Sequence, residues 1–230
     1  MTPHSAPHGR GVALFDLDGT LVDTTYPHTL AWWLALRQHG HTVPMARIHR
    51  AVGMGSDRLL DAVLGPDRDH DRDEDVSAAH GTLYATWFDR LTPFDGAAEL
   101  LRATAARGWR IVLASSASED EVAAVRARLD ADDVIETATS ASDVAASKPA
   151  PDLVEAALEA VGAAPGDAVL VGDTVWDVRA AARAGVPCVG LLTGGTTRRE
   201  LEDAGAVLVH DDPLSLLRHL DAGPLARPPA

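Results

Sequence analysis

Cysteine is nearly absent from this 230-residue sequence, in which Cys188 is the single example. No internal disulfide can form, and this usage is typical of proteins that work in a reducing compartment. We therefore expect a cytoplasmic protein. Cys188 lies in the strand-like run from Val186 to Gly190, where a buried, unreactive thiol is the simplest interpretation.

Long hydrophobic runs are missing as well. No apolar stretch approaches the roughly 20 residues that are needed to cross a bilayer, so we expect no membrane partner. Residues 1–10 contain proline, histidine and glycine but no apolar segment of the kind found in secretory signals. We expect these ten residues to form a disordered lead-in.

Positive charge is scarce. The sequence has 20 lysines and arginines against 34 aspartates and glutamates, which gives a formal net charge of −14. This balance argues against nucleic acid as a partner. It also means that an anionic ligand would need a cation placed locally at its binding site.

The stretch from Val12 to Thr24 is the most informative part of the sequence. It begins with an apolar run typical of a buried strand and ends in Asp16, with Asp18 two residues later. In an extended chain these two carboxylates point to the same side. Like charges this close raise one pKa unless a cation lies between them. The pattern indicates a metal site, an acid/base pair or both, with an ordinary polar strand end and turn as the alternative.

The rest of the chain divides by pattern. Residues 24–92 show helical spacing and no strand pattern, whereas strands and helices alternate from Asp95 onward. Such alternation predicts βαβ units and a mainly parallel sheet. We expect a doubly wound α/β core formed by residues 11–23 and 93–220, an all-helical insertion over 24–92, and a flexible tail over 221–230.

Polar residues follow several of the predicted strands. Ser115 comes after the strand from Trp109 to Ala114, Asp173 comes after the strand from Ala168 to Val171, and Asp177 and Lys148 lie at helix starts. Ligands bind beyond the carboxyl ends of parallel strands. Each residue alone also fits a helix cap, a turn or a surface lysine, but together they predict one site.

These motifs resemble the haloacid dehalogenase-like (HAD) superfamily, subfamily I. The matching segments are Asp16-Leu17-Asp18-Gly19-Thr20, the run from Ile111 to Ser115, Lys148-Pro149, and the stretch from Gly172 to Asp177. They occur in the family's order and cover nearly the whole chain. The resemblance implies a Rossmann-like core, and it implies that the insertion is the family's helical C1 cap.

The resemblance also implies a reaction. Asp16 would be the nucleophile that forms an aspartyl-phosphate, and Asp18 would act as general acid and then as general base. A magnesium ion, Mg²⁺, would be bound by the carboxylates of Asp16 and Asp173 and by the backbone carbonyl of Asp18. The second aspartate is lacking in the dehalogenase branch of the family, so its presence favours phosphate chemistry over carbon–halogen cleavage.

The remaining predicted residues would support the phosphate. The resemblance assigns Ser115, Ser116 and Lys148 to the phosphoryl oxygens, with Lys148 supplying the cation that an acidic protein otherwise lacks. Asp177 would hold either the water molecules around the metal or Lys148, and Thr20 would order the loop after Asp18.

The insertion offers three candidates for substrate contact: His28, Arg58 and the turn at 53–57. His28 lies at the entry to the insertion, in a place resembling one that faces the active site in related enzymes. Arg58 follows the turn at 53–57. The two residues also have structural interpretations: helix packing for His28, and surface ion pairs with neighbouring aspartates for Arg58.

We therefore expect a Mg²⁺-dependent phosphomonoester hydrolase that acts on a small phosphorylated metabolite and resembles phosphoglycolate phosphatases, as a monomer or homodimer. A phosphosugar mutase of the β-phosphoglucomutase type uses the same aspartates and is the alternative. A non-catalytic phosphate-sensing module is less consistent with the sequence, because both Asp16 and Asp18 are retained.

Overall fold

A computed structural model describes residues 11–144 and 146–229 of the chain. The expectation of a disordered lead-in at residues 1–10 lies outside the described residues. Among the described residues, no helix has the length and apolar character that crossing a membrane requires.

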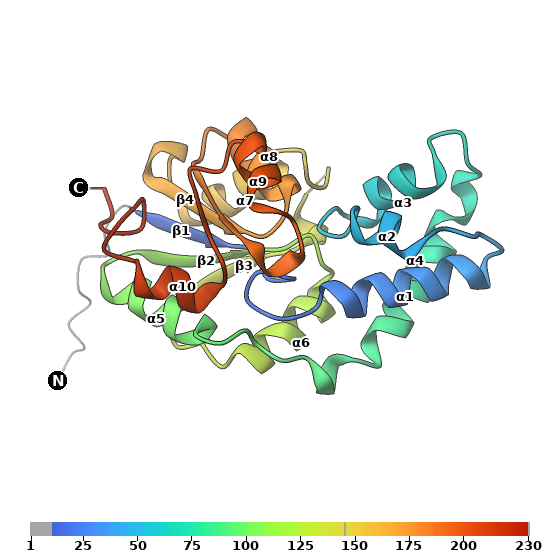
Figure 1. Cartoon of the computed structure of the whole chain (residues 1–230), viewed down its shortest axis with the longest axis horizontal. Coiled ribbons are helices and arrows are strands. Elements are labelled where there is room, and N and C mark those ends of the chain that lie inside the picture. Colours follow the sequence, from blue (N-terminus) through green and yellow to red (C-terminus); the bar gives the residue numbers. More distant parts are fainter. Residues whose placement is uncertain (1–10, 145, 230) are drawn as a thin grey trace.

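A six-stranded parallel sheet forms the centre of the fold (Figure 1), and its strand order is β3-β2-β1-β4-β5-β6. The central strand β1 pairs in parallel with both β2 and β4. The predicted α/β fold with a parallel sheet is confirmed. The strands are β1 Val12–Phe15, β2 Arg110–Ala114, β3 Ile135–Thr139, β4 Ala168–Gly172, β5 Cys188–Leu191 and β6 Leu208–His210.

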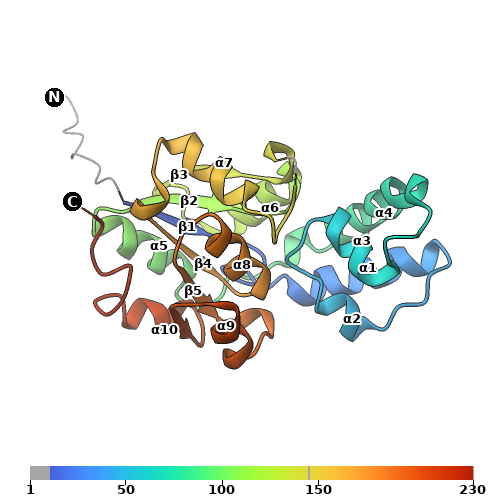
Figure 2. The ribbon, with the colours of Figure 1, turned by 90° about the horizontal axis from the view of Figure 1, so that it is seen from above.

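Helices cover both faces of the sheet, as Figures 1 and 2 show. Ala13 and Phe15 point into one core with α5, α6 and α10, while Val12 and Leu14 point into a second core with α7, α8 and α9. A strand that is buried on both faces needs apolar residues at every position, which explains the unbroken run before Asp16. The core helices are α5 Ala97–Ala106, α6 Glu119–Leu129, α7 Asp152–Val161, α8 Val175–Arg183, α9 Arg198–Ala204 and α10 Pro213–Arg218.

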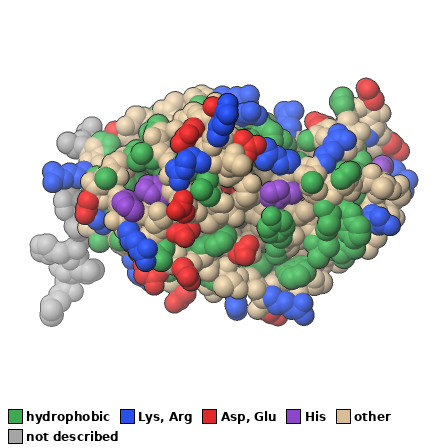
Figure 3. All heavy atoms as spheres, viewed as in Figure 1, with side chains coloured by type: hydrophobic (Ala, Val, Ile, Leu, Met, Phe, Trp, Pro, Cys, Tyr) green, Lys and Arg blue, Asp and Glu red, His purple; other side chains and the backbone are tan. Residues whose placement is uncertain are grey.

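Residues 24–92, called the helical block below, lie beyond the end of the sheet toward which β1 runs (Figure 1). The block has its own core, to which Trp32, Leu36, Ile48 and Leu60 belong. On the face in Figure 3, hydrophobic side chains gather over this block. The block also includes Tyr26, an exposed large hydrophobic residue. The α-helices of the block are α1 Thr25–Gln38, α2 Met45–His49, α3 Ser56–Leu64 and α4 Asp73–Ala85.

Several elements differ from the sequence-based prediction. The helices α9 and α10 were not expected, because each is short and offers little helical periodicity; Leu201 is the buried residue of α9. The charge-rich stretch over 65–75, whose pattern indicates a solvated surface loop, is partly ordered by Arg68, whose side chain bonds Asp61 and Asp73. The short 3-10 helices are His70–Arg72, Phe88–Arg90, Ala141–Asp143, Pro165–Asp167 and Leu192–Gly194.

Residues 221–229 pack onto the core, whereas the sequence suggested a flexible tail over 221–230. Leu225 is 2% exposed, and the indole N–H of Trp109 donates to its carbonyl at 3.1 Å. The reason is that Leu225 packs into the same hydrophobic cluster as Trp109. This apolar burial offsets the conformational entropy that the chain loses on becoming ordered.

Replacing Leu225 with alanine should therefore lower the free energy of unfolding by about 2–5 kcal/mol, the usual cost of truncating a buried leucine. Urea denaturation followed by circular dichroism measures the change. Val207→Ala, at a residue that is 49% exposed, is the control and should change stability by less than about 0.5 kcal/mol. A loss of that small size for Leu225→Ala would mean that the segment is not anchored.

Candidate active site

Asp16 leaves the carboxyl end of β1 and is held by two donors. Lys148 Nζ donates to its Oδ1 at 2.6 Å, and Thr20 Oγ1 donates to its Oδ2 at 3.1 Å. Burial raises the pKa of Asp16 to about 7, with further increases from Asp177 and Asp18, and Lys148 opposes the rise. A buried carboxylate with this pKa lacks sufficient positive charge around it.

Asp173, at the end of β4, lies against Asp16. Thr20 Oγ1 also lies 2.7 Å from Asp173 Oδ1, so this hydroxyl, with its single proton, lies between the two carboxylates. Carboxylate oxygens of Asp16, Asp173 and Asp177 all lie within 4.8 Å of one another. Burial, and then the charges of Asp177 and Asp16, raise the pKa of Asp173 well above its usual value. The cluster offers several oxygen donors, the ligand type that Mg²⁺ prefers.

Gly19 lets the loop after β1 approach this cluster. Its φ is +80°, and an added Cβ would meet Asp173 Oδ2 and Thr25 Oγ1 at 2.5 Å. The Asp-x-Asp-Gly-Thr pattern therefore has a steric reason as well as a chemical one, because any larger residue would displace Asp173.

Lys148 is the buried cation of the site. Its Nζ lies 2.6 Å from Asp16 Oδ1 and 2.7 Å from Asp177 Oδ1. Burial alone would lower the pKa of Lys148, but Asp16 and Asp177 raise it above the usual value, so the lysine is charged. Asp177 in turn accepts from Thr174 N and Oγ1 at 3.0 and 2.5 Å, which caps α8 and fixes this carboxylate.

Asp18 faces a different environment from Asp16. Its Oδ1 lies 3.3 Å from His28 Nε2, and its Oδ2 accepts from Ser115 Oγ at 3.4 Å. Burial would raise the pKa of Asp18, but the charge and hydrogen bond of His28 lower it overall. Conversely, burial would lower the pKa of His28, but Asp18 raises it overall. Two aspartates whose environments separate their pKa values are suited to two different roles.

The two serines after β2 also differ from each other. Ser115 Oγ accepts from Ala117 N at 3.1 Å as well as contacting Asp18. Ser116 Oγ is buried and has no hydrogen-bond partner. An unpaired buried hydroxyl is costly, so Ser116 is the serine that most needs a ligand atom.

A cavity of about 450 Å³ lies between the core and the helical block. Both parts contribute to its wall, so a ligand held there would contact both. The predicted residues that line it are Asp16, Asp18, His28, Ser115 and Ser116. The remaining predicted core residues are buried and lie close to Asp16: Thr20, Lys148, Asp173 and Asp177.

Arg58 is the predicted residue that the structure does not bring to the site. Its side chain is 49% exposed and pairs with Asp57 at 3.6 Å and with Asp61 at 3.9 Å. It is not among the residues that line the cavity. In this structure Arg58 forms surface ion pairs instead of contacting the cavity, because its side chain lies against two aspartates of the same helix.

The sequence analysis missed several cavity residues, among them Trp32, His80 and Glu121. His80 lies between Val76 and Tyr84 on the buried face of α4, and a polar residue on an otherwise apolar face was the available signal. Trp32 stacks on His80 with ring centroids 4.1 Å apart. Glu121 has a double role, because it completes a capping box with Ser118 at the start of α6 and also faces the cavity.

Comparisons with known proteins agree with this geometry. The family model for haloacid dehalogenase-like hydrolases matches residues 11–185. A phosphoglycolate phosphatase from Rhodospirillum rubrum is 32% identical, with 88% of each chain covered. The validoxylamine A 7'-phosphate phosphatase of Streptomyces hygroscopicus subsp. limoneus is 29% identical, covering 79% of this chain and 85% of the relative.

A solved structure supports the same assignment. The crystal structure of a hydrolase from Pseudomonas syringae superposes with a TM-score of 0.87 at 36% identity, covering 92% of this chain and 97% of that one. The resemblance inferred from the motifs is therefore confirmed, and the chain belongs to the family of haloacid dehalogenase-like hydrolases.

Proposed function

We propose that this protein is a Mg²⁺-dependent phosphomonoester hydrolase that acts on a small phosphorylated metabolite through an aspartyl-phosphate on Asp16. The observation that carries the proposal is the contrast between Asp16, held by Lys148 at 2.6 Å, and Asp18, held by His28 at 3.3 Å. In this proposal Asp16 attacks the phosphate and Asp18 moves a proton. The phosphatase relatives support phosphate esters as the substrate class.

The acidic cluster fits a divalent cation. The pKa values of Asp16 and Asp173 are raised because burial and neighbouring carboxylates leave their charges insufficiently balanced. We assign the carboxylates of Asp16 and Asp173 and the backbone carbonyl of Asp18 as ligands. Mg²⁺ bound there would reduce the repulsion between the carboxylates and an incoming phosphate.

The first step is attack by an Asp16 carboxylate oxygen on phosphorus. The bond from phosphorus to the leaving oxygen breaks, and that oxygen takes a proton from Asp18. A phosphate that arrives beside Asp18 raises the pKa of this carboxyl by charge repulsion, which favours the protonated form that the step needs. We assign Ser116 and Lys148 to the binding of the phosphoryl oxygens.

The second step returns the enzyme to its starting state. Asp18, now ionised, takes a proton from water, and the water oxygen attacks phosphorus. The bond between phosphorus and Asp16 then breaks, and inorganic phosphate leaves. Retention of both aspartates in this geometry favours an enzyme over a phosphate-sensing module.

A phosphosugar mutase would need a cation in the cavity to hold a second phosphate. Among the described residues that line the cavity there is no lysine or arginine, so the wall favours hydrolysis. Phosphate release from p-nitrophenyl phosphate and from a panel of phosphorylated metabolites, with and without Mg²⁺, tests the proposal. Hydrolysis that is equally fast in excess EDTA, or no hydrolysis of any ester, would contradict it.

His28→Ala should slow the enzyme most on esters with poor leaving groups. Losing a hydrogen bond between charged groups typically costs about 1.5–3 kcal/mol. Without His28, Asp18 is held less well in the position from which it donates its proton. Glucose 6-phosphate needs that proton, whereas p-nitrophenolate leaves without it. We expect kcat to fall at least about tenfold more for glucose 6-phosphate than for p-nitrophenyl phosphate.

Arg58→Ala is the matched comparison for His28→Ala, because both residues belong to the helical block. The exposure of Arg58 and its pairing with Asp57 and Asp61 predict little change in the ratio of the two rates. A ratio that moves for Arg58→Ala and stays constant for His28→Ala would reverse the assignment of these residues.

A further inference from the structure

The part of the cavity beyond the phosphate site has an unusual wall for a site that receives anions. No lysine or arginine occurs among the lining residues in the part of the chain that the structure describes. Serine hydroxyls, two carboxylates and a histidine are present instead. These groups are Ser56, Ser77, Ser118, Ser147, Asp57, Glu121 and His80.

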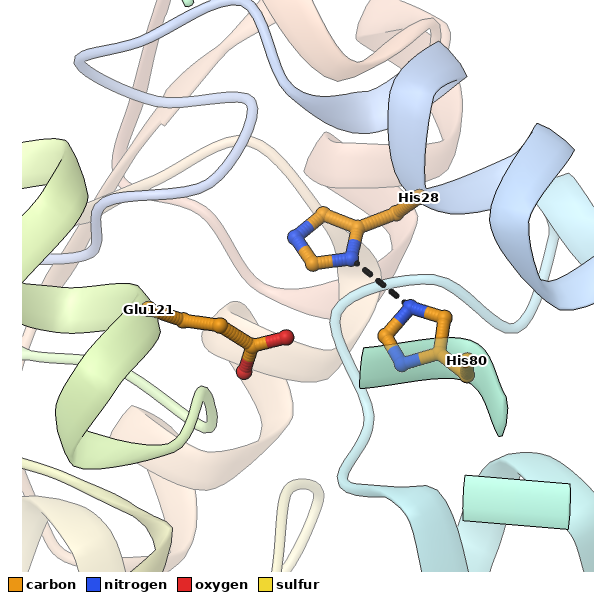
Figure 4. Close-up of side chains that lie close together, drawn as sticks. All are labelled: His28, His80 and Glu121. Atoms are coloured by element: carbon orange, nitrogen blue, oxygen red, sulfur yellow. Dashed lines mark hydrogen bonds between the residues drawn. The ribbon is translucent and has the colours of Figure 1, made fainter. Parts of the chain in front are cut away.

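Glu121 projects into this space from the core helix α6. Figure 4 shows its carboxylate directed toward His28 and His80 of the helical block. One oxygen, Oε2, accepts from Ser118 N at 2.8 Å and from Ser118 Oγ at 2.9 Å. A carboxylate oxygen of Glu121 and ring nitrogens of both histidines lie within 4.8 Å of one another. The cap bonds hold Glu121 in place and leave Oε1 available to a ligand.

The charge of Glu121 is not cancelled by its neighbours. His28 is already engaged with Asp18 at 3.3 Å. Burial, together with the nearby charge of His28, lowers the pKa of His80 well below its usual value, so this ring is neutral. Even with His28 protonated, Asp18 and Glu121 together leave the wall with a net negative charge.

Asp57 adds to the acidic character at the rim. Ser147 Oγ donates to its Oδ1 at 2.7 Å, and Arg58 lies 3.6 Å from its Oδ2 on the outer side. This carboxylate is therefore partly balanced by Arg58, which leaves Glu121 as the principal charge that a leaving group meets.

Resting on the proposed phosphatase function, we infer that the natural leaving group is a hydroxyl-rich alcohol bearing an amine, without a carboxylate or second phosphate. An ammonium group would pair with Glu121, and hydroxyl groups would exchange hydrogen bonds with the serines and His80. A carboxylate such as that of phosphoglycolate would meet Glu121, and the nearby His28 is already paired with Asp18 at 3.3 Å. The subsite thus selects by charge at the end opposite the phosphate.

Three esters on the same two-carbon frame test this inference: phosphoethanolamine, 2-hydroxyethyl phosphate and phosphoglycolate, which differ in the charge of the leaving group. With Mg²⁺ as the only divalent cation, we expect kcat/KM to be at least about tenfold higher for phosphoethanolamine than for phosphoglycolate, since opposite and like charges at about 4 Å differ strongly. Glucosamine 6-phosphate, glucose 6-phosphate and 6-phosphogluconate form a second series, in which we expect the same order.

Glu121→Gln removes the charge while glutamine can still complete the capping box. The ratio of kcat/KM for phosphoethanolamine over phosphoglycolate should fall at least about fivefold toward unity, and 2-hydroxyethyl phosphate should be little affected. Glu119→Gln is the control, because this residue is exposed in the first turn of the same helix. This control substitution should leave kcat/KM unchanged for all three esters.

The charge preference and the phosphatase activity can be tested separately. If the wild-type protein hydrolyses p-nitrophenyl phosphate but prefers phosphoglycolate, the charge inference is wrong and the phosphatase proposal stands. Loss of that preference in Arg58→Ala would then locate acid binding at Arg58. If Glu121→Gln leaves the ratio unchanged, the inference is also wrong. If no ester is hydrolysed at all, the proposed function itself has failed.

Discussion

Asp16→Asn should lower kcat by at least about a thousandfold, as expected when a covalent nucleophile is removed. Asparagine has nearly the same size as aspartate but no negative charge, so its side chain is a far weaker nucleophile. The change also removes one oxygen ligand from the acidic cluster and the charge partner of Lys148, which lies 2.6 Å away. Phosphate release from p-nitrophenyl phosphate at saturating Mg²⁺ measures the effect.

Asp23→Asn is the matched control for the nucleophile. Asp23 follows the same loop but is exposed, so the identical chemical change there should alter kcat by less than about twofold. Circular dichroism of both variants checks that the fold is intact. Near-normal turnover by Asp16→Asn would exclude attack by this carboxylate.

Asp173→Asn should weaken Mg²⁺ binding at least about tenfold and reduce turnover by at least about a hundredfold, since a direct ligand matters no less than the groups that orient it. The asparagine in this variant would keep the size of the side chain and an acceptor for Thr20 but not the charge. Ca²⁺ should inhibit the wild-type enzyme, because its larger radius and irregular coordination tie up carboxylates that must stay free. Isothermal titration with Mg²⁺ and steady-state rates measure the two effects.

Thermal melting gives this prediction a second readout that does not depend on activity. Burial and the charges of Asp177 and Asp16 raise the pKa of Asp173, so at pH 8 its ionisation costs stability in metal-free protein. Asp173→Asn should then melt at the same temperature as the wild type or higher in EDTA. Added Mg²⁺ should raise Tm for the wild type but much less for the variant. Equal Mg²⁺ stabilisation of both proteins would remove Asp173 from the metal site.

The core of the fold could be predicted because its strands are buried on both faces. The run from Val12 to Phe15 and the one over β4 have to be apolar at each position, and the polar residues that follow them mark the strand ends. The site residues Asp16, Asp18 and Asp173 were found for the same reason, since parallel strands bring their carboxyl ends to one edge. The strand order was not predicted, because local patterns do not specify which strands pair.

The cavity wall could not be read in this way. His28 and His80 are 52 residues apart and meet through the packing of α1 against α4, with ring nitrogens 3.2 Å apart. A capping box with Ser118 is enough to explain Glu121 from the sequence. The sequence does not show that the capped helix faces a cavity. The sequence suggested that Leu225 belongs to a flexible tail, because its contact with the core joins segments that are far apart along the chain. Such tertiary contacts join distant segments and leave no periodic signal.

The most direct test of the aspartyl-phosphate mechanism uses Asp18→Asn with p-nitrophenyl phosphate. Because p-nitrophenolate leaves without help from an acid, this variant should still transfer the phosphoryl group to Asp16. It lacks the base that activates water, so the covalent form should accumulate. Rapid mixing with Mg²⁺ should release a burst of about one p-nitrophenolate per enzyme, and mass spectrometry of the quenched protein should locate a phosphoryl group on Asp16. Turnover by the wild-type enzyme, together with an unphosphorylated Asp16 and no burst in Asp18→Asn, would contradict the mechanism.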